Sequence, residues 1–422
     1  MRKRVVITGL GFVTSIGNSR SSVLNSLKKG KSGIGILPDL PQRKGLSGLA
    51  GTIKDFTFPS YRCEDWVMPK DCLIDRLHMR SMSPHVVYAC YAMQQAIQEA
   101  SLGENLISHP RTGAMCASGG SMSTAYENLH TMETLGVERC YPLALPASIP
   151  GVLNSNLAAK YKLKGSVLGF SSACASSAHA LGYAYDQIIL DRQDIVFVVG
   201  AEDCNRFNIL PFAGIRALSE RTDPEQTPSP FDADRDGFVG TGGATTLVLE
   251  DLEHAQTRGA RIFAEVLGWG EAADGYNVMA PEPHGEGLTR AMKSALENSR
   301  LKPEDIDYIN AHGTGTTAGD QAEISAIRQV FCSGRTPYIS STKALTGHGL
   351  SLAGAMEAAF CVLALQEKFL PISAKIKRLD PDFADLPIIT KPSNHEPKIA
   401  LSNSSGFGGA NVSLIFQRWA EA

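Results

Sequence analysis

Short runs of β-branched and aromatic residues alternate along the chain with longer segments whose apolar residues recur at helical spacing. The short runs predict strands, and the longer segments predict helices. The predicted strands are residues 4–8, 113–116, 166–170, 195–200, 245–250, 307–310 and 399–401. The predicted helices are residues 84–100, 175–190, 286–299, 321–331 and 350–366. This alternation is typical of an α/β fold in which helices cover buried, largely parallel strands.

The pattern of strand and helix restarts near Asp251. We therefore predict two halves, residues 1–251 and 252–422. The chain has 422 residues, of which 43% are hydrophobic and 20% charged. This composition is ordinary for a globular protein, and the length is sufficient for two packed halves.

Charge and apolar patterning exclude several classes of partner. The formal net charge is -3, and Lys and Arg form no long run, so we do not expect a nucleic-acid partner. No stretch approaches the roughly 18 uninterrupted apolar residues of a membrane span. The first eleven residues lack the long apolar region of a signal peptide, so we expect a cytoplasmic protein.

Nine cysteines are scattered along the chain without a CxxC pair. Their number and spacing argue against a disulfide framework and against a zinc site. A reducing compartment fits this usage, and we expect eight of the nine to be structural thiols.

Two motifs suggest ligands that the rest of their pattern does not support. Gly9 and Gly11 follow a predicted strand as in a dinucleotide fingerprint, but Thr14 stands where the third Gly should be, so we expect a tight turn and no nicotinamide site. Residues 232–237 match the first half of a calcium loop, but Gly243 occupies the position of the bidentate Glu. We therefore expect no metal.

The stretch 171–180 follows a predicted strand and opens an apolar helix, which places Cys174 at a strand-to-helix turn. Unpaired N–H groups and the positive end of the helix dipole favour a thiolate there, and small neighbours let an acyl group approach. A buried, inert cysteine is the more common outcome for this residue type. The context nevertheless makes Cys174 the candidate nucleophile.

Three further stretches carry candidate chemistry. Residues 310–320 place His312 in a loop of Gly and Thr, which lets a polar chain such as a pantetheine arm run close to the backbone. Residues 341–349 place His348 just before an Ala-rich helix, and residues 404–411 form a Gly-rich turn before a terminal strand. Either histidine alone is more often structural than catalytic, but their joint occurrence with Cys174 favours a site.

These four stretches together resemble the elongating β-ketoacyl-acyl carrier protein synthases, the condensing enzymes of fatty acid and polyketide synthesis. The likeness covers nearly the whole chain and is greatest to the bacterial type I enzyme, notably over residues 172–179 and 193–197. It implies a thiolase-like fold with two similar α/β halves in five layers (αβαβα), no metal or organic cofactor, and a homodimer. It also implies acyl- and malonyl-loaded acyl carrier protein as the partner.

Carried over position by position, the resemblance implies Cys174 as nucleophile, with His312 and His348 donating to the malonyl thioester oxygen as carbon dioxide leaves. It makes Lys343 and Glu323 supporting charged residues. The remaining implied residues are the pantetheine-contacting Thr314 and Thr316, and the gating Phe407, whose N–H would form an oxyanion hole with that of Cys174.

The chain departs from the family pattern at Ser405, where a bulky Phe is usual, and at Ala410, where Thr is usual. These departures keep open a second interpretation, in which the chain is a ketosynthase subunit of a specialised type II polyketide or polyene pathway, paired with a related chain-length-factor-like subunit. A non-catalytic, carrier-binding protein of the same fold is a third. The complete Cys–His–His set favours condensation in fatty acid elongation.

Overall fold

A computed structural model describes residues 3–331 and 334–420, so Cys332 lies outside the described residues. Within these ranges, ten strands form one mixed sheet, and two short strands pair separately. The strands are β1 (Val5–Val13), β2 (Ile34–Ile36), β3 (Leu49–Gly51), β4 (Thr112–Ala117), β5 (Val167–Phe170), β6 (Ile195–Glu202), β7 (Gly243–Asp251), β8 (Ala264–Ala273), β9 (Tyr308–Asn310), β10 (Tyr338–Ser340), β11 (Ile399–Gly406) and β12 (Ala410–Arg418).

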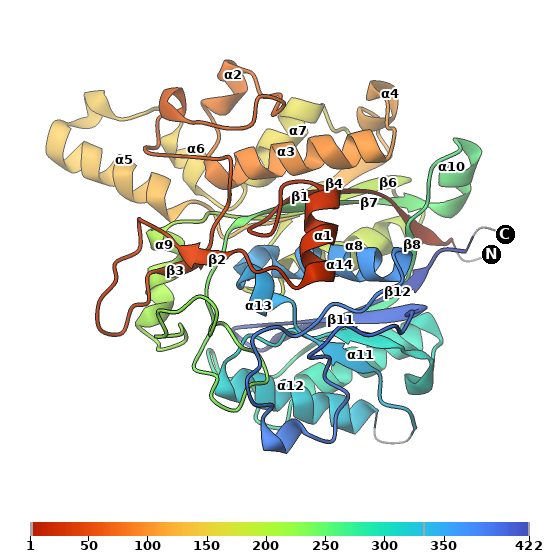
Figure 1. Ribbon diagram of the computed structural model, residues 1–422. Helices are drawn as coiled ribbons and strands as arrows, with labels where there is room; N and C mark the ends of the chain where they lie inside the picture. Colours follow the sequence, from red (N-terminus) through yellow and green to blue (C-terminus); the bar gives the residue numbers. More distant parts are fainter. Residues whose placement is uncertain (1–2, 332–333, 421–422) are drawn as a thin grey trace.

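Helices occupy most of the segments between the strands (Figure 1). They are α1 (Arg20–Lys29), α2 (Arg76–Met79), α3 (Pro84–Glu99), α4 (Glu104–Ile107), α5 (Met122–Leu135), α6 (Ala144–Ser148), α7 (Val152–Tyr161), α8 (Ser176–Ile189), α9 (Arg206–Ile209), α10 (Leu252–Thr257), α11 (Glu286–Ser299), α12 (Thr317–Val330), α13 (Lys343–Thr346) and α14 (Ala353–Gln366).

The strand order repeats within the sheet. Outward from β1 the order is β1-β7-β6-β4-β5, and outward from β8 it is β8-β12-β11-β9-β10. When the five strands of each run are numbered by their order in the sequence, both runs read first, fifth, fourth, second, third. β1 and β8 join the two runs by antiparallel pairing of Val5 with Val266. The boundary predicted at residue 251 falls between β7 and β8, and the division into two domains stays a prediction.

Helices and strands form five layers. In Figure 1, α8 and α14 lie between the two runs of strands, α3 and α7 cover one outer face, and α11 and α12 cover the other. Alternate residues of β6 serve different layers: Val196 and Val198 belong to the core around the central helices, and Phe197 and Val199 belong to the core under α3. The predicted five-layer α/β arrangement is confirmed.

The prediction of largely parallel strands is wrong. In the described part of the ten-stranded sheet, β4 pairs in parallel with β5 and β6, and β9 pairs in parallel with β10 and β11. All the other neighbouring pairs in that sheet are antiparallel. Helices cover both faces of the antiparallel strands too, so a continuous apolar run marks burial and does not reveal direction.

Gly9 and Gly11 lie inside β1 and not in the predicted tight turn. A Cβ atom at Gly11 would lie 1.8 Å from the backbone oxygen of Ala92, and one at Gly9 would lie 2.3 Å from that of Ala96. The two glycines therefore let α3 pack directly on β1. Across residues 3–331 and 334–420, every helix is too short or too polar to traverse a lipid bilayer.

Candidate active site

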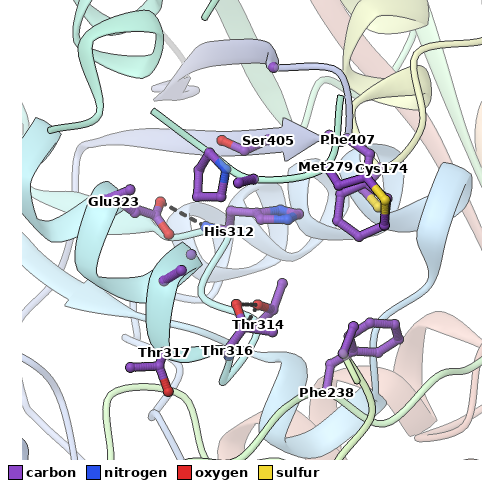
Figure 2. Close-up of a pocket in the computed structure, with 18 of the residues that line it drawn as sticks. Cys174, Phe238, Met279, His312, Thr314, Thr316, Thr317, Glu323, Ser405 and Phe407 are labelled. Carbon is purple, nitrogen blue, oxygen red and sulfur yellow. Dashed lines mark hydrogen bonds between the residues drawn. The ribbon is translucent and has the colours of Figure 1, made fainter. Parts of the chain in front are cut away.

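A cavity of about 500 Å³ lies where the ends of β9 and β11 meet the start of α8 (Figure 2). It brings together seven of the eight residues that the sequence singled out. These are Cys174, His312, Thr314, Thr316, Glu323, His348 and Phe407. Lys343 is fully buried behind the wall of the cavity and contacts His312.

Cys174 occupies a tight turn between β5 and α8. Ala173 has a positive φ of 50°, and Ser176 holds the turn by accepting from the Ser172 N–H at 2.8 Å and donating to the Ala173 oxygen at 2.6 Å. A Cβ atom at Gly406 would lie 3.0 Å from the Cys174 nitrogen. The end of β11 therefore runs directly against the turn that carries Cys174, and only glycine permits that approach.

Only 7% of the surface of Cys174 is exposed, and burial raises the pKa of its thiol to about 12. The positive charge of Lys343 lowers this pKa, but less than burial raises it. The unpaired N–H groups at the start of α8 also favour the anion. The resting group is a thiol near neutral pH, which reverses the sequence-based expectation of a thiolate.

Glu323 and Asp320 of α12 hold the loop that carries His312. The Glu323 carboxylate accepts from the N–H groups of His312 and Gly313 at 2.9 and 2.7 Å. The Asp320 carboxylate accepts from the N–H groups of Thr314 and of the next residue at 3.0 and 3.1 Å. Four successive peptide groups are thus fixed by two buried carboxylates, and sequence reasoning gave Asp320 no role.

The threonine hydroxyls of this loop stand side by side. The Oγ1 atoms of Thr314 and Thr316 lie 2.9 Å apart, and both residues line the cavity. A hydroxyl both donates and accepts, so this pair offers hydrogen-bonding capacity to a polar chain passing along the wall.

The imidazole rings of His312 and His348 lie in an edge-to-face arrangement. The ring centroids of His312 and His348 lie 5.3 Å apart with an interplanar angle of 83°. Burial lowers the pKa of each ring well below its usual value, and Lys343 lowers both further. Both imidazoles are therefore neutral, and each can donate one N–H without carrying charge.

Lys343 and Glu357 form an ion pair with no exposed side-chain surface. Lys343 Nζ also donates to the His312 backbone oxygen at 2.5 Å and lies 3.5 Å from His312 Nδ1. Burial raises the pKa of Glu357 to about 7, and Lys343 opposes that rise. Sequence reasoning missed Glu357, although a single charged residue inside the otherwise uncharged α14 is a signal that it must have a partner.

Phe407 stands at the tip of the hairpin between β11 and β12, with 38% of its surface exposed. Its ring lies 6.1 Å from that of Phe212. Ser405 lines the cavity beside it, and Ala410 pairs with Gly406 across the hairpin. The aromatic ring therefore lies at the boundary between the cavity and solvent, which is where a gate would act.

Comparison with known proteins assigns the family. Residues 2–255 match the family described as beta-ketoacyl synthase, N-terminal domain, and residues 263–377 match beta-ketoacyl synthase, C-terminal domain. The chain belongs to the beta-ketoacyl synthase family. This membership confirms the prediction of a condensing acyltransferase with a thiolase-like fold.

The similarity extends over full lengths. The 3-oxoacyl-[acyl-carrier-protein] synthase 1 of Haemophilus influenzae is 40% identical, covering 99% of this chain and 99% of that protein. The crystal structure of a beta-ketoacyl synthase from Burkholderia phymatum is 34% identical with a TM-score of 0.89, covering 99% of this chain and 100% of the other. A third solved structure is described as a type II polyketide synthase acyl-carrier protein in complex with its ketosynthase. One chain of that structure is 28% identical with a TM-score of 0.86, covering 99% of this chain and 100% of the other.

Proposed function

We propose that this beta-ketoacyl synthase elongates acyl chains on acyl carrier protein by decarboxylative condensation with a malonyl unit, as in fatty acid synthesis. One observation carries the proposal: Cys174, His312 and His348 line one cavity, and both imidazoles are neutral. The greater similarity to 3-oxoacyl-[acyl-carrier-protein] synthases than to the polyketide ketosynthase supports the fatty acid assignment.

In the first half-reaction, the Cys174 sulfur attacks the acyl thioester and the carrier leaves as a thiol. The Cys174 proton must depart as the S–C bond forms, and a neutral imidazole in the same cavity can accept it and pass it to the leaving sulfur. The N–H groups of Cys174 and Phe407 would bind the transient oxyanion. The close approach of Gly406, the residue before Phe407, to the Cys174 nitrogen supports this pairing.

In the second half-reaction, the malonyl thioester loses carbon dioxide, and the electron pair of the broken C–C bond forms an enolate. Its carbon attacks the acyl carbonyl, and the Cys174 sulfur leaves. The step requires stabilisation of negative charge on the thioester oxygen, and His312 and His348 would supply one N–H donor each. Lys343 would keep both rings neutral and hold the His312 backbone.

The pantetheine arm of the carrier would pass along Thr314 and Thr316. We further propose a homodimer, because β5 is an edge strand of the sheet and Leu168 on it is 49% exposed. An unpaired apolar edge favours pairing with a second chain. A heterodimer with a related subunit and a polyketide role is the alternative, and a cytoplasmic location remains part of the proposal.

The function is tested with acyl-loaded and malonyl-loaded carrier protein and mass spectrometry of the products. Cys174→Ala should abolish acyl transfer and condensation, and His312→Ala or His348→Ala should slow release of carbon dioxide from malonyl carrier. Cys140→Ala, a half-buried cysteine outside the cavity, is the matched control. Full condensation by the Cys174→Ala protein would refute the nucleophile assignment, and isolation as a heterodimer that extends only unsaturated chains would favour the polyketide alternative.

A further inference from the structure

Ser405 is a small residue in the cavity wall at the end of β11, and we call the part of the cavity beside its side chain the recess. Its side chain lines the cavity, and its hydroxyl donates to Asn411 Oδ1 at 2.7 Å. Asn411 is 4% exposed, and its amide Nδ2 donates to Asp274 Oδ1 at 2.7 Å and to the Gly409 oxygen at 2.9 Å. The small side chain at position 405 is therefore held against the wall and does not project into the space before it.

The same hydrogen bonds join the hairpin to the loop 274–285 that faces it. The second carboxylate oxygen of Asp274 accepts from the Glu282 N–H at 3.1 Å, and the Gly408 N–H donates to the Val278 oxygen at 2.8 Å. A Cβ atom at Gly287 would lie 2.0 Å from Asp274 Oδ1, so α11 also packs closely on this carboxylate. Because the wall is tied on both sides, it cannot simply collapse into the recess.

The recess lies on the malonyl side of the site. Figure 2 shows Ser405 over His312, with Phe407 and Cys174 further along the cavity. Leu288 and Ala322 also line the cavity. On the other flank, the sulfur of Cys174 packs in an apolar cluster with Phe238 and Leu350, which suits the acyl tail. A group beside His312 would therefore belong to the extender unit.

We propose that the small side chain of Ser405 determines which extender units, the malonyl-type thioesters that are condensed with the acyl-enzyme, the site accepts. In particular, we propose that the site accepts a malonyl thioester with a small alkyl substituent on C2. The inference rests on the proposed condensation. With methylmalonyl carrier, the C2–carboxylate bond breaks, carbon dioxide leaves, C2 attacks the acyl carbonyl, and the Cys174 sulfur departs. The product is a 2-methyl-3-oxoacyl thioester, and the methyl group occupies the recess below Ser405.

The test is a competition between malonyl and methylmalonyl carrier proteins for the same acyl-enzyme, with both products quantified by mass spectrometry. The native protein should form both. Ser405→Phe fills the recess and should lower the ratio of methylated to unmethylated product by about tenfold or more, since one methyl group in a fitted pocket is worth that much. Ser405→Ala keeps the space and should preserve the ratio within about threefold, because only a hydroxyl held by the wall is lost.

Ser404→Ala is the matched control, because alternate residues of a strand face opposite sides and Ser404 is buried on the far face of β11. Ser405→Val provides a second, smaller filling of the recess and should also lower the ratio. Native protein that forms only unmethylated product, or a ratio that Ser405→Phe and Ser405→Val leave unchanged, would overturn the inference while leaving the condensation itself established. If Ser405→Ala lowers the ratio of methylated to unmethylated product as much as Ser405→Phe does, side-chain volume is not the cause and the inference is overturned. Absence of both products from native protein would instead reject the proposed function.

Discussion

Replacing Glu357 by Gln should destabilise the protein strongly while changing no exposed group. Glu357 and Lys343 have no exposed side-chain surface, and the only other acceptor within 3 Å that the described structure gives Lys343 Nζ is the His312 backbone oxygen. The amide keeps the shape of the carboxylate but leaves an ammonium group uncompensated in the interior. Removing one member of such a buried pair costs about 3–5 kcal/mol of unfolding free energy.

A double-mutant cycle separates this effect from loss of packing. Lys343→Met combined with Glu357→Gln removes both charges, and well-packed replacements of buried ion pairs are often nearly neutral. The double variant should therefore be more stable than Glu357→Gln alone by about 2 kcal/mol or more. That sign, in which a second substitution restores stability, is the signature of an uncompensated charge.

Unfolding in urea at about pH 8, above the pKa of about 7 that burial gives Glu357, measures these differences when followed by tryptophan fluorescence. Glu286→Gln is the matched control, because Glu286 pairs with Arg290 at 3.7 Å on the exposed face of α11. Loss of that exposed pair should change stability by less than about 0.5 kcal/mol. The reasoning is refuted if Glu357→Gln costs less than about 1 kcal/mol, or if the double variant is less stable than either single variant.

Three further results are expected. The rate of malonyl decarboxylation should stay level as pH falls from about 8 to 6, because burial holds the pKa of His312 and His348 well below the usual 6.5 and the rings remain neutral; a decline centred near 6.5 would contradict this. Gly406→Ala should lower kcat/KM for acyl transfer by about 100-fold, because its Cβ would lie 2.5 Å from the Ser172 oxygen beside the nucleophile turn; near-native single-turnover kinetics would refute it. Thr314→Val should raise the KM for carrier-bound substrate by about fivefold with little change in kcat, and a change confined to kcat would exclude a binding role.

The elements that the sequence located best are those buried on both sides. The run at 195–200 and the apolar segment at 350–366 correspond closely to β6 and α14, because few conformations bury so many adjacent apolar side chains. Strand direction was not predictable, because the partner of a strand such as β7 is far away in the sequence. Strand β8 was missed: the Gly and Glu residues of its second half interrupt the apolar pattern, although the strand pairs with both β1 and β12.

At the site, the predicted residues that face the cavity, apart from Glu323 in α12, stand in short motifs of small and polar residues that follow a strand, and this made them predictable. Asp320 and Glu357, which act from behind the wall of the cavity, were not predicted. Asp320 belongs to an ordinary amphipathic helix, and Glu357 is recognisable only once its partner Lys343 is known to be buried. The protonation state of Cys174 also required the structure, because the balance between burial and the helix end depends on how closely the walls approach.

The repeated strand order means that the two sides of the cavity are built from equivalent parts of the two runs. Cys174 precedes α8, and His348 precedes α14, so equivalent turns of the two runs of strands supply residues to one cavity. In the proposed mechanism, Cys174 at the first turn accepts the acyl group, and His348 at the second turn donates a hydrogen bond to the enolate oxygen. If one run of strands slid against the other, the Cys174 sulfur would move away from the His348 imidazole. The antiparallel pairing of β1 with β8 opposes that sliding.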